Sequence, residues 1–486
     1  MKKKFQAIYR VNLPEKVPFS VKAYYGLGQF SVGSFGIMSR LCLFFFYSQV
    51  LGISPALVGF ATAVATVFDA ITDPIIGSIS DNFKSKYGRR LPFLFAGTLP
   101  TSISIFLLFN PLVTGDAALF YWLVFFSCLT NFLSTLFVIP YFAVGAEITE
   151  NYDERASVVA FRNFFYFFGQ AFVMYLAYGY FFLPSEEFTN GQLNPAVYGP
   201  FSVVVAMLFL VTSVISIFGF KNHIPNNYRG NLESLSFSKI FLTIFRDIFE
   251  ALSNYSFRML FFGNVFLTIS AGISFTLELY ALTFFWGLSG ELSLLLVGLA
   301  FYPGAFLGVF LSNYLIQAFE KRNVMVWGII LWILFIVVPI ILSMNGLFPA
   351  SGTATLIVLL IISKIIQGLV IIPPDVAFNA AMADTADQQE LVNSKRQEGI
   401  FFASAYFSIK ASYGIGAAIA GVALTLIGWP TGSEAEITDL NIYNLGIILG
   451  PVVAVFGLIG GFIYSKYDLT REKHEQIRSQ LKEKRG

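Results

Sequence analysis

Apolar runs of about 20 residues recur along the whole chain, separated by short polar breaks. A helical run of this length crosses the ~30 Å hydrocarbon core of a bilayer. Twelve spans are predicted, at 26–50, 58–80, 91–113, 118–146, 157–183, 200–220, 259–288, 292–318, 324–346, 352–380, 398–429 and 441–465. Only 12% of the 486 residues are charged, against about 25% in soluble domains. The sequence therefore predicts an all-α, multi-pass integral membrane protein embedded in the lipid bilayer.

The charges and cysteines argue against several other classes. The formal net charge is +2, and no basic tract interrupts the apolar runs, so nucleic acid is not expected as a partner. Cys42 and Cys128 lie inside apolar runs, so neither a disulfide framework nor a cysteine-based metal site is expected. The charged start, Met1 to Lys22, lacks the short apolar core of a cleaved signal peptide. Insertion is expected to depend on the first span.

Among the loops between the predicted spans, Lys and Arg occur only in alternate ones. They occur at the amino terminus, in 84–90, 221–258, 321–322 and 395–396, and in the tail from 466, and they are absent from 51–57, 114–117, 184–200, 289–291, 345–351 and 430–440. These residues stay preferentially on the cytoplasmic side. Both termini are therefore expected in the cytoplasm, which agrees with an even number of spans. A bacterial-type inner membrane is the expected location.

The longest polar break divides the chain near its middle. Residues 221–257 separate an amino-terminal bundle of six spans, 1–220, from a carboxy-terminal bundle and tail, 258–486. Within the break, Phe237–Leu252 alternates apolar and charged residues at helical spacing. This pattern fits either an interfacial amphipathic helix or an ordinary solvated linker.

Weak repeats support this division. Val58–Gly59 opens the second predicted span, and Val297–Gly298 opens the eighth, 239 residues later. Two further correspondences have similar offsets: Asp81 with Glu320, and Ala146–Glu147 with Ala383–Asp384. Two similar six-helix bundles that face each other across a central cavity form the architecture of major facilitator transporters.

The second span and the following loop carry the most specific motif. It runs Asp69-Ala-Ile-Thr72-Asp73-Pro74 and continues from Gly77 to Gly88-Arg89-Arg90. Supporting pieces lie in other spans: Tyr25-Gly26-Leu27-Gly28, Ile139-Pro140-Tyr141, Phe161-Arg162 and Met382-Ala383-Asp384 leading to Lys410. Over nearly the whole chain, the sequence closely resembles the glycoside–pentoside–hexuronide:cation symporter family, the melibiose permease type within the major facilitator superfamily. The Asp-x-x-x-Asp-Pro element is fairly specific, whereas the Gly77–Arg90 loop marks the wider superfamily.

The paired acids of this motif are the candidate cation site. Asp69 and Asp73 are four residues apart, hence on one face of a helix, and an intramembrane carboxylate costs about 2.5–3.5 kcal/mol on insertion scales. A bound cation or a shared proton relieves the repulsion between two such groups. The resemblance implies a coupling-cation site, for Na⁺ or H⁺, at four side chains: Asp69, Thr72, Asp73 and Thr135. Hard oxygen ligands suit sodium. The alternative is a structural pair neutralised by Arg40 or Lys410.

Two basic residues inside spans are candidate substrate ligands. The resemblance places the family's sugar-site arginine at Arg162 and its span-eleven lysine at Lys410. Arg162 can hold a carboxylate or sulfonate by two parallel hydrogen bonds. A salt bridge between helices, with Asp69, Glu278 or Asp375, is the other interpretation of both residues.

Departures from the family pattern concern the substrate. Galactoside-transporting relatives have acids in spans one and four, where this chain has Gly33 and Val138, and extra cations occur at Arg40 and Lys364. Loss of anions and gain of cations favour an anionic substrate, although Arg40 and Lys364 could equally snorkel to lipid headgroups. The candidate substrate-binding residues are Arg162, Lys410, Gly33, Val138, Phe142 and Arg40.

The functional expectation follows from the resemblance. We expect a monomeric symporter that couples Na⁺ or H⁺ to import of a glycoside, uronide or similar anionic saccharide by alternating access, without a cofactor. Six residues are expected to control gating: Asp81, Arg89, Arg90, Glu147, Asp384 and Arg396. Eukaryotic relatives of the family move lysophospholipids, so a lipid transporter is the alternative. A membrane-embedded enzyme is not expected, because no nucleophile–base pair, metal spacing or nucleotide loop is found.

Overall fold

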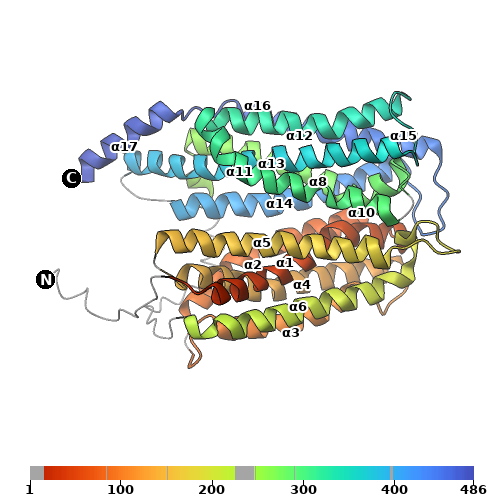
Figure 1. The fold of residues 1–486 in the computed structure, drawn as a ribbon, viewed down its shortest axis with the longest axis horizontal. Helices are drawn as coiled ribbons and strands as arrows, with labels where there is room; N and C mark the ends of the chain where they lie inside the picture. Colours follow the sequence, from red (N-terminus) through yellow and green to blue (C-terminus); the bar gives the residue numbers. More distant parts are fainter. Residues whose placement is uncertain are drawn as a thin grey trace. The chain divides into compact units, whose positions relative to one another are not determined.

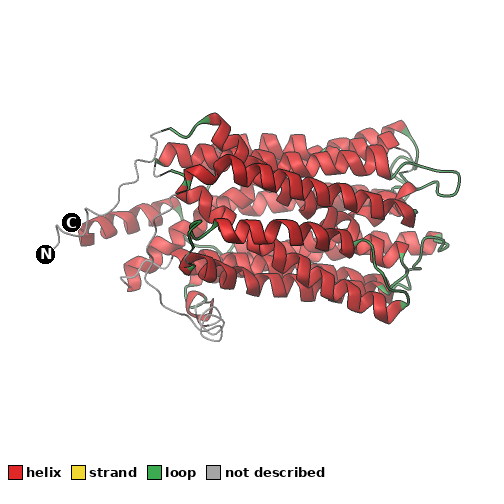
Figure 2. Cartoon of the chain, turned by 90° about the horizontal axis from the view of Figure 1, so that it is seen from below, coloured by secondary structure: helices red, strands yellow, loops and turns green. Residues whose placement is uncertain are grey.

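A computed structural model describes residues 16–83, 85–149, 151–224, 246, 248–288, 291–393 and 398–485. Within these ranges all regular secondary structure is helical and no strand occurs (Figure 2), which confirms the predicted all-α class. Most of Phe237–Leu252, the predicted interfacial segment, lies outside the described residues, as does Arg396.

The chain divides into two compact units. One comprises Met1–Leu43, Ile71–Ala177 and Ala196–Phe237, and the other comprises Phe44–Ala70, Tyr178–Pro195 and Ser238–Gly486. Helix α2 (Pro55–Asn82) passes from the second unit into the first between Ala70 and Ile71. The predicted division at 221–257 stays a prediction.

The first unit contains the second half of α2 and five further helices: α1 (Phe19–Phe45), α3 (Leu91–Leu108), α4 (Asp116–Glu147), α5 (Tyr152–Leu176) and α6 (Tyr198–Phe220). Helix α3 packs along α4 and α6 (Figure 1). Aromatic side chains fill the core, where the rings of Tyr25 and Tyr141 stack with centroids 4.5 Å apart. The Tyr141 hydroxyl donates to the Tyr25 carbonyl at 2.5 Å, which fixes α1 against α4.

The second unit contains the first half of α2 and most of the remaining helices: α8 (Tyr255–Thr276), α9 (Glu278–Tyr280), α10 (Glu291–Leu299), α11 (Phe301–Ala318), α12 (Lys321–Met344), α13 (Ala354–Asn393), α14 (Glu398–Leu426), α15 (Asp439–Ile447), α16 (Val453–Tyr464) and α17 (Arg471–Arg485). Three short π-helical segments also lie in this unit: η1 (Phe46–Val50) follows α1, η6 (Ala281–Phe285) follows α9, and η7 (Ile448–Val452) lies between α15 and α16. Helix α11 packs along α13, and α8 packs against both α14 and α16.

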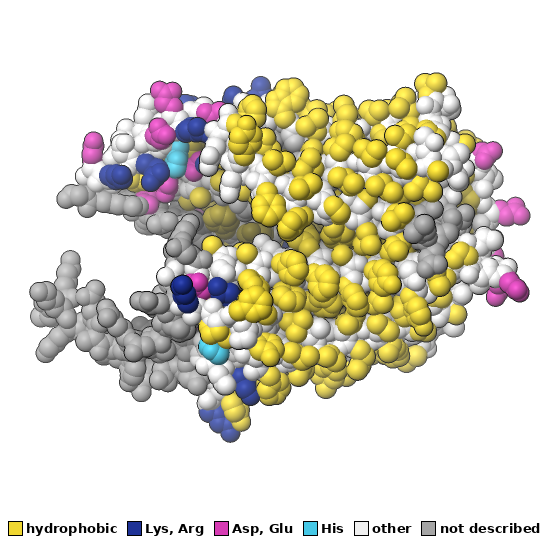
Figure 3. All heavy atoms as spheres, in the orientation of Figure 1, with side chains coloured by type: hydrophobic (Ala, Val, Ile, Leu, Met, Phe, Trp, Pro, Cys, Tyr) yellow, Lys and Arg dark blue, Asp and Glu magenta, His cyan; other side chains and the backbone are white. Residues whose placement is uncertain are grey.

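Eleven of the described helical stretches are long and apolar enough to cross a membrane. Helix α5 is not among them, and its first eleven residues include Asp153, Glu154, Arg155 and Arg162. The count of twelve spans therefore stays a prediction. On the face shown in Figure 3, hydrophobic side chains cover the helices of each unit, and Lys, Arg and His side chains gather near one end of its helices.

Helix α13 is longer than predicted. It continues beyond residue 380 to Asn393 and has 40 residues, hence a length of ~60 Å, twice the hydrocarbon core of a bilayer. Apolarity alone marked the predicted span, whereas the helix continues through polar residues. We therefore expect the part that carries Asp384 to project beyond the bilayer.

Glycines let α11 and α13 approach closely. A Cβ atom at Gly304 would lie 1.8 Å from the carbonyl oxygen of Ile365, and one at Gly368 would lie 2.1 Å from that of Phe301. Close backbone approach through small residues is a common way to pack helices in membranes.

We predict that Gly304→Ala destabilises the protein by about 1–3 kcal/mol, the usual effect of overpacking a tight contact. Thermal unfolding in detergent measures the effect. Gly399→Ala in α14 is the matched control, because a Cβ atom there meets nothing within 4 Å and alanine favours the helix. Equal unfolding temperatures for Gly304→Ala and wild type would show that the two helices separate at little cost.

Lys22 on α1 and Glu154 on α5 form an ion pair at 2.8 Å, outside the predicted span 157–183. Glu154 also accepts a hydrogen bond from the N–H of Val17 at 2.9 Å. The hydrogen bond from Lys22, followed by that from Val17, lowers the pKa of the Glu154 carboxyl below its usual value.

We predict that Glu154→Gln lowers the unfolding temperature at pH 7 and that this difference disappears in acid. Because the folded-state pKa is depressed, the stabilisation is present above the unfolded-state pKa of about 4.3 and is lost as the pH falls through the folded-state value. Thermal unfolding of both proteins across this range measures the difference. A constant difference down to the lowest pH would contradict a role for the ionised carboxylate.

Candidate transport site

The motif residues Asp69, Thr72 and Asp73 lie in the middle of α2. The separation of Asp69 and Asp73 by one turn is set by the helix itself. Pro74 follows inside the helix, and because proline has no N–H it cannot donate to the carbonyl four residues earlier, that of Ala70. This carbonyl oxygen lies in the chain between the two acids. The sequence analysis did not include the Ala70 carbonyl among the candidate cation ligands, although the position of Pro74 indicates that this carbonyl lacks its helical donor.

The two acids have different partners. The hydroxyl of Thr135 on α4 donates to Oδ1 of Asp73 at 3.0 Å. Nζ of Lys410 on α14 donates to Oδ2 of Asp69 at 2.7 Å, and the Lys410 and Asp69 side chains are 39% and 19% exposed. The structure thus contains the salt bridge to Asp69 that was one of the two interpretations of Lys410.

Arg162 lies among aromatic side chains in the first unit. Its guanidinium carbon lies 4.9 Å from the ring centroid of Phe142 on α4, a cation–π arrangement. Its Nε is 3.5 Å from Oδ1 of Asn163 on the same helix. Two of the six candidate substrate residues, Arg162 and Phe142, are therefore in contact.

Three other candidate substrate residues make packing or local contacts. A Cβ atom at Gly33 would lie 2.3 Å from the carbonyl oxygen of Tyr166, so an acidic side chain at this position would force α1 and α5 apart. Val138 packs against the apolar core of the first unit. Arg40 donates to the Gly36 carbonyl at 3.1 Å and to the Tyr166 hydroxyl at 3.2 Å.

Four of the expected gating residues come together in the first unit. Arg89 contacts Oε1 of Glu147 at 2.6 Å, and Nε of Arg90 contacts the same oxygen at 3.1 Å. Arg90 also pairs with Asp81 and donates to the Ser80 hydroxyl at 2.8 Å. Because Arg90 immediately precedes α3 and Glu147 ends α4, these contacts join the ends of α2, α3 and α4.

A related arrangement occurs in the second unit. Lys321, the first residue of α12, pairs with Asp384 on α13. His474 on α17 lies 3.5 Å from Asp384 and 3.1 Å from Asp387. Sequence reasoning had not linked His474 to gating, because it lies about 90 residues from these acids and no local pattern joins them. Arg396 is outside the part of the chain that the structure describes.

Comparisons with known proteins identify the family of the chain. Residues 24–471 match the family model described as MFS/sugar transport protein. The isoprimeverose transporter of Lactiplantibacillus pentosus is 25% identical, over 91% of this chain and 87% of its own. The sodium-dependent lysophosphatidylcholine symporter 1-A of Danio rerio is 22% identical, over 90% of this chain and 83% of its own.

The fold is also that of solved transporters. The xylose transporter XylE from E. coli, in an inward open conformation, matches with a TM-score of 0.59 at 13% identity, over 95% of this chain and 99% of its own. This likeness shows the fold, and the family model spans almost the whole chain. The expected resemblance is confirmed: the chain belongs to the MFS/sugar transport protein family and is a symporter of the glycoside–pentoside–hexuronide:cation type, a multi-pass membrane transporter rather than an enzyme.

Proposed function

We propose that the protein imports an anionic saccharide together with a monovalent cation that binds at Asp69 and Asp73. The observation that carries the proposal is the pair of contacts on α2, with Thr135 on Asp73 and Lys410 on Asp69. One acid is thus hydrogen-bonded to a hydroxyl that can also serve as an oxygen ligand, and the other is paired with an ammonium group. Such an arrangement suits a cation that binds by displacing Lys410 from Asp69.

The cation competes with Lys410. An ionised carboxylate inside a membrane is costly without a partner, and the Lys410 ammonium is the partner seen on Asp69. A cation that binds the two acids takes over this role and releases Lys410 to donate to a substrate. Within the described ranges no three His, Cys, Asp or Glu side chains come together, so further ligands would be hydroxyl and carbonyl oxygens. The Thr72 and Thr135 hydroxyls and the Ala70 carbonyl are of this kind, and these hard ligands favour sodium.

Arg162 supports an anionic substrate. In the described part of the chain no carboxylate lies within ion-pair distance of its guanidinium, and its recorded contacts are aromatic and amide groups. A guanidinium in a membrane segment gains from an anionic partner, and it binds carboxylates in a planar, two-point geometry. The isoprimeverose transporter among the relatives supports a saccharide as the substrate class.

We predict that Asp69→Asn and Asp73→Asn each abolish accumulation driven by a sodium gradient in proteoliposomes, whereas substrate exchange survives. Thr135→Val should weaken the sodium dependence less, because it removes one neutral ligand. Asp116→Asn is the control, since this exposed acid begins α4. Replacing the sodium gradient by a pH gradient distinguishes the two cations. Uphill uptake that is unchanged in both aspartate variants would remove the acids from the coupling site.

The charge of the substrate has a measurable electrical consequence. One cation moving inward down 100 mV releases about 2.3 kcal/mol, which supports roughly 40-fold accumulation of a neutral substrate. With a monovalent anion the cycle carries no net charge. We therefore predict that a membrane potential alone, measured with a potassium diffusion potential, leaves the accumulation unchanged. A strong response to potential would indicate a neutral substrate or a second cation.

We predict that Arg162→Lys weakens binding of uronate-type substrates by about 1–3 kcal/mol, or ~5- to 150-fold, because the charge remains but the planar contact is lost. Competition against a labelled substrate measures this loss. Arg155→Lys is the matched control, because Arg155 lies on the same helix and donates to backbone carbonyls near its start. Neutral galactosides that compete with wild type as strongly as uronates would refute the anionic substrate and leave the family unaffected.

A lysophospholipid is the second candidate substrate. It is favoured by the similarity to the Danio rerio symporter, which extends over 90% of this chain. A thermal-shift screen of uronates, neutral sugars and lysophosphatidylcholine, each with and without sodium, distinguishes the classes. Stabilisation by lysophosphatidylcholine alone would favour this candidate over the saccharide.

A further inference from the structure

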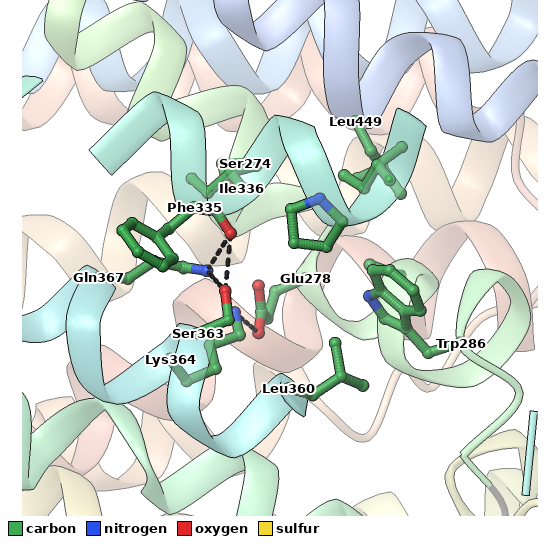
Figure 4. Close-up of a pocket in the computed structure, with 13 residues that line it drawn as sticks. Ser274, Glu278, Trp286, Phe335, Ile336, Leu360, Ser363, Lys364, Gln367 and Leu449 are labelled. Carbon is green, nitrogen blue, oxygen red and sulfur yellow. Dashed lines mark hydrogen bonds and ion pairs between the residues drawn. The ribbon is translucent and has the colours of Figure 1, made fainter. Parts of the chain in front are cut away.

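Glu278 and Lys364 form an ion pair inside the second unit (Figure 4). Nζ of Lys364 on α13 donates to Oε1 of Glu278 at the start of α9, at 2.5 Å, and the two side chains are 19% and 20% exposed. Both residues lie in segments predicted to span the membrane. Ionisable residues at such positions are costly and most often functional.

A small cavity adjoins this pair. Its volume is about 40 Å³, which provides room for about two or three water molecules but not for a sugar ring. The polar part of its lining comprises Ser274, Glu278, Trp286, Ser363, Lys364 and Gln367. One carboxylate oxygen of Glu278 is directed to Lys364 and the other towards the cavity (Figure 4). Water can therefore reach the carboxylate.

Two neighbouring polar side chains have a structural role. Pro339 lies inside α12 and cannot donate to the carbonyl of Phe335, four residues earlier. The Ser363 hydroxyl donates to this carbonyl at 2.7 Å and Nε2 of Gln367 at 3.1 Å. Of the side chains that line the cavity, only Glu278 and Lys364 can titrate.

The repeated fold does not require this pair. The π-helical segments η1 and η6 begin 235 residues apart, so the residue of the first half that corresponds to Glu278 is Leu43. Glu147 and Asp384 are 237 residues apart, and by this offset the residue that corresponds to Lys364 is Ser127. Neither equivalent residue is charged, although its bundle has the same kind of fold. The ion pair is therefore an addition to one half and not a requirement of both.

We propose that Glu278, held by Lys364 beside this cavity, is a proton-binding site. A proton from cavity water adds to the Glu278 carboxylate and gives the neutral acid, while Lys364 keeps its ammonium form. The net charge of the pair changes from zero to +1, with no other bond made or broken. The proton competes with the ammonium for the carboxylate, so its binding releases the contact between α9 and α13.

This site goes beyond the proposed function, because it adds a pH-dependent input that is separate from the cation at Asp69 and Asp73. A transporter with both sites responds to sodium and to pH through different acids. Substitution of one acid should therefore remove the response to sodium or the response to pH without removing the other.

Infrared difference spectroscopy of the purified protein, without substrate or sodium, tests the site directly. Acidification from neutral pH should produce the carbonyl band of a protonated carboxyl in wild type. Glu278→Gln should lack this band, and Asp116→Asn should keep it. Lys364→Gln should keep the band, because it leaves the Glu278 carboxyl in place.

Glu278→Gln leaves a buried ammonium without its partner and could misfold, so Glu278→Gln/Lys364→Met serves as a second variant with neither charge. In proteoliposomes at saturating sodium, this double variant should lose the pH dependence of uptake and keep sodium-driven accumulation. Asp69→Asn should keep the Glu278 band.

Two results would overturn the proposal. One is a wild-type spectrum without a new carboxyl band on acidification, or with a band that Glu278→Gln retains. The other is an unchanged pH profile in the double variant. Either result would assign the pair to structure alone and leave the cation site on α2 unaffected.

Discussion

An ionised side chain inside a bilayer is costly unless another group compensates for its charge, and the interior of this protein is organised around that constraint. Asp69 is compensated by Lys410 and Glu278 by Lys364. Asp73 is hydrogen-bonded to Thr135, and Arg162 lies over the face of an aromatic ring. In the proposed function, a mobile ligand replaces each of these compensating groups: a metal cation, a proton or an anionic substrate. The cost of buried charge would then couple the binding of one ligand to that of another.

Proline has a related effect on the backbone. Pro74 leaves the Ala70 carbonyl without its usual helical donor, and Pro339 does the same to the Phe335 carbonyl. Ser363 and Gln367 both donate to the second carbonyl and join α12 to α13. The first lies beside the two acids of α2, where an oxygen atom can serve a cation. The missing N–H of proline therefore leaves a carbonyl that joins two helices in one place and a carbonyl that is a candidate cation ligand in the other.

The two halves also share an arrangement at their charged helix ends. A base at the start of α3, Arg90, pairs with Glu147 at the end of α4, and a base at the start of α12, Lys321, pairs with Asp384 on α13. The weak repeat in the sequence had related Glu147 to Asp384, and the structure shows that both acids have a basic partner. In the second unit the acid also contacts His474 of the carboxy-terminal helix, a contact without a counterpart among the repeats found in the sequence.

The sequence by itself determined the all-α class, the positions of the apolar helices, the family and the one-turn spacing of Asp69 and Asp73, because each depends on residues close together in the chain. It could not determine how far α13 continues, since its polar end has no apolar signal. Tertiary structure alone decided which cation meets which acid: Lys410 and Asp69 are 341 residues apart, and Lys364 and Glu278 are 86 apart. It also decided that Gly33 lies against the backbone of α5. Such contacts depend on how helices pack, and the local periodicity of a sequence does not record that packing.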